Sequence, residues 1–127
     1  MLRCAIAISL IAAAAPALAA SPSMTAGQFL AKAEPLLKKN KMALIFSKDA
    51  RTLMGTLTEA GQHNRARLEA DRAAGRRIDT CLPAKGKAKV NANELLAHIR
   101  AMTPVQKAQS FDAAFASYTA KKYPCRA

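Results

Sequence analysis

The sequence predicts an all-α fold, a small helical bundle of about four helices with one disulfide. Apolar residues recur at helical spacing in several segments, and most of these segments begin with a residue type that caps helices. The short apolar run at residues 42–46 has no partner strand elsewhere in the chain, so we interpret it as a buried helical turn. A single helical domain is expected over residues 21–127.

Residues 1–20 have the pattern of a secretory signal peptide. Arg3 precedes an apolar run from Ala5 to Ala20, and Ala17-Leu18-Ala19 matches a small-residue cleavage site. The apolar run is too short to span a membrane comfortably, although retention as a membrane anchor is the alternative. We expect residues 1–20 to be removed, no membrane span to remain, and the mature protein to be periplasmic or secreted.

Removal of residues 1–20 changes the cysteine count and the charge. Cys4 is lost, which leaves Cys81 and Cys125, and an even pair in an exported chain predicts a disulfide. Loss of Arg3 reduces the 20 basic residues to 19 against 8 acidic ones, a net charge of +11. The remaining chain of about 107 residues would bury roughly 65% of its unfolded surface, enough for one modest core.

The first helix is predicted to begin after Thr25. Thr25 and Gln28 have the spacing of a capping box, and Met24 with Phe29 has that of a hydrophobic staple. Pro35 lacks the amide hydrogen that would bond four residues back, so the helix is expected to end or kink there. The apolar face of this helix consists of Phe29, Leu30, Ala33 and Leu37.

A long helix is predicted from Lys48 to about Ala74, with a length of about 40 Å. Ser47 is its expected N-cap, Asp49 lies in its first turn, and Gly75 supplies a stop. Its second half is rich in charged residues and is expected to pack thinly or to project beyond the core. The predicted apolar stripe is Ala50, Leu53, Met54, Leu57, Gly61, Asn64 and Leu68.

Residues 78–89 are predicted to form a loop, after which the third helix begins. Asn91 and Glu94 have the spacing of a second capping box, and Val90 with Leu95 that of a second staple. The expected apolar face is Leu95, Leu96, Ile99 and Met102.

Thr103-Pro104 interrupts the third helix, and a last helix is predicted to begin near Ser110. It should stop before Pro124, because the residue before a proline disfavours helical geometry. One side of this helix carries Phe111, Ala114, Phe115 and Tyr118.

The sequence offers no catalytic constellation, so we expect no enzyme activity, no cofactor and no metal. His63 and His98 each follow a glutamate by four residues, but a metal site needs at least three converging ligands. A cysteine nucleophile is disfavoured because Cys81 and Cys125 are better explained as a bridge.

Clustered positive charge is the other candidate signal. It could bind phosphates, but nucleic acid is disfavoured because the chain lacks an aromatic stacking platform. An acidic protein or an anionic envelope surface fits an exported basic protein better. The candidate partner-binding residues are Arg76, Arg77, Lys85, Lys87 and Lys89.

The C-terminal half contains Cys81-Leu82-Pro83, a helix opened by Glu94-Leu95, Thr103-Pro104, and Tyr123-Pro124-Cys125. Over about 45 residues, this set of motifs resembles the Rap/Tai family of periplasmic immunity proteins. The family's members are small, exported, all-helical and often dimeric, and they bind and block peptidoglycan-cleaving amidase effectors of type VI secretion. The resemblance implies a structural bridge between Cys81 and Cys125, beside Pro83 and Pro124, but it assigns no contact residues.

We therefore expect an exported protein-binding module whose partner is a protein effector, with an amidase as the candidate that the resemblance implies. Homodimer formation is a further expectation from the resemblance. Two alternatives remain open: a periplasmic stress or chaperone-like protein, similar in plan to small disulfide-bridged acid-stress helical proteins, and a basic polyanion-binding envelope protein.

Overall fold

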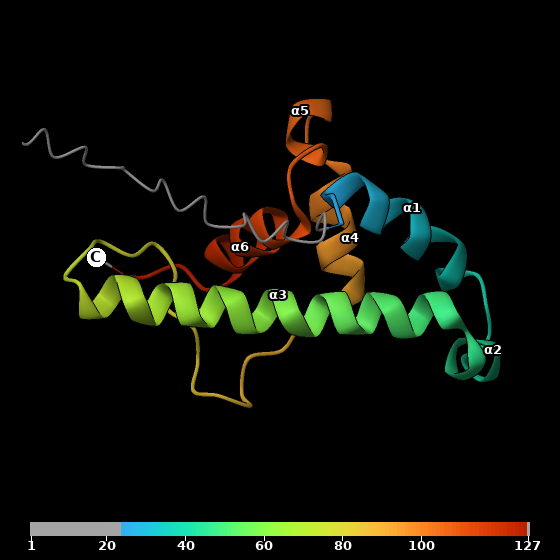
Figure 1. Ribbon diagram of the computed structural model, residues 1–127, viewed down its shortest axis with the longest axis horizontal. Coiled ribbons are helices and arrows are strands. Elements are labelled where there is room, and N and C mark those ends of the chain that lie inside the picture. The colour runs from blue at the N-terminus through green and yellow to red at the C-terminus, as the bar shows by residue number, and fades with distance from the viewer. Residues whose placement is uncertain (1–23, 127) are drawn as a thin grey trace, which may run out of the picture.

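The structure is a computed structural model that describes residues 24–126 (Figure 1). The expected signal peptide, residues 1–20, lies outside the described residues. The described part is all-α, as the sequence predicts, and it has six helices and no strand. None of its helices is long and apolar enough to cross a membrane.

Four longer helices correspond to the predicted ones, and two short helices join them. The helices are α1 (Ala26–Leu37), α2 (Lys41–Phe46), α3 (Lys48–Ala73), α4 (Ala92–Arg100), α5 (Pro104–Lys107) and α6 (Phe111–Lys122). α3 runs along most of the molecule, and α1, α4 and α6 lie on one side of it (Figure 1). The bundle therefore has one long helix as its base.

The predicted start of α1 is confirmed. The Thr25 hydroxyl accepts from the Gln28 amide at 3.1 Å, and the Gln28 side chain accepts from the Thr25 amide at 3.0 Å. Pro35 lies inside α1, which continues for two more residues and ends at Leu37. The start of α3 is confirmed as well, since Ser47 caps it by accepting from the Ala50 amide at 3.3 Å.

The predicted capping box of α4 forms only in part. The Asn91 side chain accepts from the Glu94 amide at 3.2 Å, as expected. The Glu94 carboxylate instead accepts hydrogen bonds from Lys122 at 2.9 Å and from Tyr118 at 3.2 Å. The Asn91 amide donates to the Tyr118 hydroxyl at 3.3 Å, so α6 supplies the partner that the capping box would have used.

The predicted burial of residues 42–46 is wrong. The run forms a helical turn, α2, but no residue of α2 is buried. Met42, Ile45 and Phe46 are 64%, 63% and 75% exposed. Leu44 alone packs partly against the core, because α2 lies at the N-terminal end of α3, beyond the other helices (Figure 1).

The buried face of α3 agrees only in part with the predicted apolar stripe. Met54 is 61% exposed, contrary to expectation. The buried positions of α3 are Leu53, Ala60, Asn64 and Leu68. The second half of α3 is thus anchored by Asn64 and Leu68 and does not simply project into solvent.

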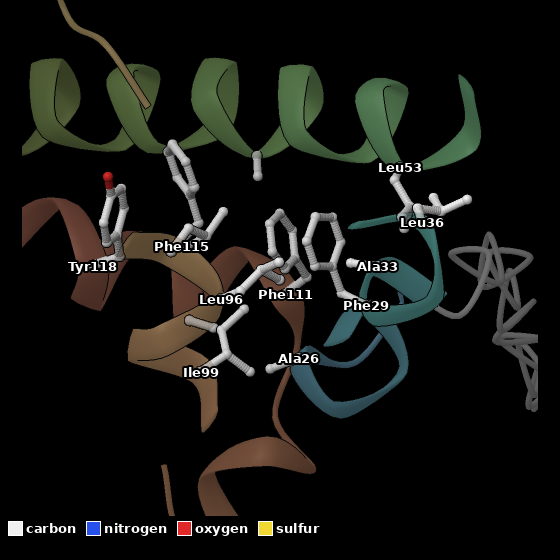
Figure 2. Close-up of a cluster of buried hydrophobic side chains, with 13 residues drawn as sticks. Ala26, Phe29, Ala33, Leu36, Leu53, Leu96, Ile99, Phe111, Phe115 and Tyr118 are labelled. Atoms are coloured by element: carbon white, nitrogen blue, oxygen red, sulfur yellow. The ribbon is translucent and has the colours of Figure 1, made fainter. Parts of the chain in front are cut away.

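The core lies where α1, α4 and α6 meet the face of α3 (Figure 2). Phe29 of α1 stacks on Phe111 of α6 with ring centroids 4.0 Å apart. The two helix starts are also tied by backbone bonds, since the Phe111 amide donates to Met24 and the Ala26 amide donates to Gln109 at 2.8 and 2.9 Å. These contacts fix α1 against α6.

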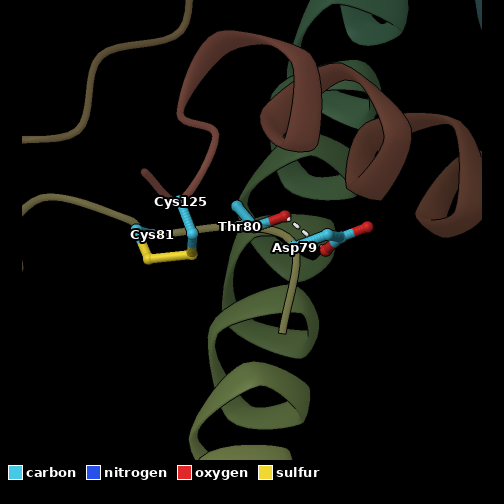
Figure 3. The surroundings of a disulfide bond; sticks show 4 residues. All are labelled: Asp79, Thr80, Cys81 and Cys125. Carbon is cyan, nitrogen blue, oxygen red and sulfur yellow. Dashed lines mark hydrogen bonds between the residues drawn. A yellow bond between two sulfur atoms is a disulfide. The ribbon is translucent and has the colours of Figure 1, made fainter. Parts of the chain in front are cut away.

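The predicted disulfide between Cys81 and Cys125 is confirmed, with a Cα–Cα distance of 4.9 Å (Figure 3). The chain on either side of the bridge is paired as well. The Cys81 amide donates to the Tyr123 carbonyl at 2.8 Å, and the Cys125 amide donates to the Asp79 carbonyl at 3.2 Å. The bridge therefore joins the segment after α3 to the segment after α6.

Candidate binding groove and basic segment

A groove of about 690 Å³ lies between α3, α6 and residues 82–90. Its floor is mostly apolar, with Leu57 from α3 and Phe115 from α6 among the lining residues. Val90 and Leu82 line it from the loop side. A groove lined mainly by apolar groups, with a few polar side chains among them, is typical of a binding site.

We call residues 82–90 the basic segment; it forms one wall of the groove and is held at both ends. At one end, the Arg65 guanidinium donates to the Pro83 carbonyl at 3.2 Å. At the other end, the Tyr123 hydroxyl accepts from the Lys89 amide and donates to the Lys89 carbonyl, each at 3.2 Å. Cys81, directly before the segment, is fixed by the disulfide.

A tight turn forms the tip of the basic segment. The Lys87 amide donates to the Ala84 carbonyl at 2.9 Å, and Gly86, the third residue of the turn, has φ +86°. A left-handed third position is the geometry for which turns use glycine. Lys85 and Lys87 belong to this turn and both are exposed. The segment extends past α3 in Figure 1.

The five candidate partner-binding residues do not form one site. Lys85 and Lys89 line the groove, together with Arg65 and Glu69 of α3. Lys87 is exposed on the same segment but does not line the groove.

Arg76 and Arg77 lie apart from the groove, after the end of α3. Arg76 Nε donates to Asp71 Oδ1 at 2.8 Å, and Arg76 Nη2 forms an ion pair with the same oxygen at 2.8 Å. Arg77 lines a separate hollow of about 650 Å³, with Arg67 and Arg126. The structure thus separates the two arginines from the three lysines.

A polar cluster occupies the contact between α4 and α6. Lys122 donates to Glu94, and this bond lowers the pKa of the Glu94 carboxyl and raises the pKa of the Lys122 amine. Burial first, and the nearby Lys121 charge second, lower the pKa of His98. The His98 ring is hydrogen-bonded to the Ser117 hydroxyl at 2.8 Å.

The two glutamate–histidine spacings do not produce metal sites. His63 pairs with Asp112 at 2.8 Å, and Glu94 and His98 bond to different partners on α6. Within residues 24–126, no group of three or more His, Cys, Asp or Glu side chains could hold a metal ion.

Sequence reasoning missed the residues that hold the groove together. Arg65 belongs to none of the predicted caps, apolar faces or candidate sites, and Tyr123 enters only through the Tyr123-Pro124-Cys125 motif. No spacing rule indicated that either would bond to the basic segment, because both contacts join parts of the chain that are far apart in sequence.

Comparisons with protein-family models, curated proteins and solved structures give no match for this chain.

Proposed function

We propose that this chain is an exported protein-binding module that inhibits an effector protein, as immunity proteins of the Rap/Tai family do. The basic segment makes the contact in this proposal, and an acidic cleft of a peptidoglycan amidase is the partner that the resemblance implies. The observation that carries the proposal is the fixed, protruding turn with Lys85 and Lys87 at its tip.

Preorganisation supports this role for the basic segment. Ordering a loop on binding costs free energy, and a loop already held in place avoids much of that cost. The Arg65 and Tyr123 hydrogen bonds and the disulfide at Cys81 hold the segment before any partner arrives.

Charge supports the choice of an acidic partner. The segment carries three lysines and no acidic residue. Complementary charge accelerates encounter and favours one partner over others, while the adjoining apolar floor could bury side chains of the partner.

Charge reversal in the basic segment tests the proposal. We expect Lys85→Glu, Lys87→Glu and Lys89→Glu together to weaken binding about tenfold or more, because each introduced glutamate would repel an acidic cleft that the lysine attracts. The partner would be an amidase captured from envelope extract with the tagged protein, and the affinity would be measured by calorimetry.

The matched control reverses three lysines elsewhere, Lys38, Lys39 and Lys41, all of which are exposed. It changes the net charge equally but leaves the basic segment intact. Equal weakening by the two triple variants would show that net charge alone attracts the partner. Unchanged affinity in the variant of Lys85, Lys87 and Lys89 would refute contact through the basic segment.

A further inference from the structure

We propose that α2 and its flanks dock onto the surface of an anionic lipid bilayer, with the exposed apolar face of α2 entering the interface and the neighbouring cations facing the headgroups. We call residues 37–54 the α2 surface. It is separate from the groove, since no residue of the α2 surface lines it.

Exposed apolar side chains are concentrated on the α2 surface. Five of the seven large apolar side chains that are exposed in the described residues belong to it. They are Leu37 (49% exposed), Met42 (64%), Ile45 (63%), Phe46 (75%) and Met54 (61%). Soluble domains rarely expose such a group without an interaction that covers it.

The spacing within α2 directs three of these side chains to one side. Met42, Ile45 and Phe46 are three and four residues apart, so they share a helix face. The partly buried Leu44 attaches α2 to the core. The Asn40 side chain caps the helix by accepting from the Ala43 amide at 2.8 Å, which keeps the short turn helical.

Exposed cations precede and follow the apolar residues of α2 along the chain. The α2 surface contains five basic residues and one acidic residue, Asp49. The basic residues, all exposed, are Lys38, Lys39, Lys41, Lys48 and Arg51. An apolar face with flanking lysines and arginines is the pattern of helices that lie in an anionic membrane interface.

The charge also excludes a second copy of the chain as the favoured occupant. A symmetric contact through the α2 surface would place two sets of cations against each other. An anionic bilayer neutralises them instead.

Shape favours a bilayer over an acidic protein. α2 lies at the margin of the molecule, at the N-terminal end of α3 and beyond the other helices (Figure 1). A projecting apolar turn can enter a soft lipid interface directly, whereas a protein partner would need a matching groove. The described helices cannot span a bilayer, so the contact would be peripheral.

Vesicle sedimentation with the exported protein tests the inference. We expect binding to vesicles that contain phosphatidylglycerol and weak binding to pure phosphatidylcholine vesicles. Ile45→Ser with Phe46→Ser should weaken binding about tenfold or more, since both apolar side chains would be lost from the interface. Val105→Ser is the matched control, because Val105 is 75% exposed on α5, and it should bind as the parent does.

Fluorescence can locate the contact because the chain contains no tryptophan. Phe46→Trp should show a blue-shifted emission with anionic vesicles and quenching by brominated lipid, whereas Val105→Trp should show neither. These two variants distinguish insertion of α2 from attraction of the whole basic protein to the vesicle.

The inference would be overturned by equal affinity for the two vesicle types, or by no vesicle binding at all. Equal loss of binding in the Val105→Ser control would also overturn it. So would a dimer that dissociates when Ile45 and Phe46 are replaced, or capture of unfolded polypeptide by α2 without vesicle binding, because another occupant would then cover the α2 surface.

Discussion

Asn64 of α3 donates a hydrogen bond from its side-chain amide to the hydroxyl of Thr119 of α6, across 2.9 Å. Both residues are only 4% exposed. Both side chains form a further hydrogen bond within their own helix. Arg67 donates to the side-chain oxygen of Asn64, and the Thr119 hydroxyl donates to the backbone carbonyl of Ala116, each at 3.0 Å. This satisfied polar pair sets the position of α6 along α3.

Breaking one side of the pair should destabilise the protein more than replacing both sides. We expect Asn64→Leu to lower the free energy of unfolding by about 1–3 kcal/mol, because the Thr119 hydroxyl loses its buried donor. Adding Thr119→Val should recover part of that loss, since no unpaired polar group then remains between the helices.

Urea unfolding of the two single variants and the double variant measures this coupling. Strictly additive losses would show that the Asn64–Thr119 bond does not link the two helices energetically.

The helices could be predicted from the sequence because their signals are local. The caps at Thr25 and Ser47 and the apolar face of α6 each involve residues within a few positions of one another, and all are confirmed. The disulfide could be predicted because only two cysteines remain after residue 20.

The site could be predicted only in part, because it depends on contacts between distant residues. Asn64 was placed on the correct face of α3 by its spacing, but nothing in the sequence indicated Thr119 as its partner. The burial of α2 was predicted wrongly because an apolar run gives no information about whether another element covers it.

Removing the disulfide should lower stability substantially. Cys81 and Cys125 are 44 residues apart, and closing a loop of that size stabilises a fold by about 4 kcal/mol in the chain-entropy model. Cys81→Ser with Cys125→Ser should lower the midpoint of thermal unfolding while the helical circular dichroism at low temperature is retained. A midpoint equal to that of the oxidised parent would contradict this stabilising role.

His98 should make the stability sensitive to mild acid. Its pKa is lowered in the folded state, so the unfolded chain binds a proton more readily. The stabilisation is complete above about pH 6.5, the ordinary range of histidine, and is lost as the pH falls toward the folded-state pKa. Lys121 repels the protonated ring, and the nearby Glu94 is already paired with Lys122.

Replacing the titrating ring isolates this effect. His98→Gln keeps a side chain that can bond to the Ser117 hydroxyl but cannot titrate, so its stability should change less between about pH 7 and pH 5.5 than that of the parent. Chemical unfolding at several pH values measures the difference. Parallel curves for the parent and the variant would exclude His98 as the source.

Tyr123 should control the rigidity of the basic segment. Tyr123→Phe removes both hydrogen bonds to Lys89 but keeps the ring against the groove, so the bundle should stay folded. Hydrogen exchange at the Lys89 amide should accelerate about fivefold or more, because its only acceptor among residues 24–126 is lost. The Lys87 amide, which bonds to Ala84 within the turn, serves as the internal reference and should change much less.

The same variant connects rigidity to binding. If a preorganised basic segment inhibits the effector, Tyr123→Phe should weaken the complex severalfold even though every lysine remains, because the segment must then be ordered on binding. Faster exchange at Lys89 with unchanged affinity would show that the segment either does not need to be fixed or does not touch the partner. Comparison with the Lys85, Lys87 and Lys89 charge reversal separates these two cases, since only a segment in contact with the partner responds to the loss of its charge.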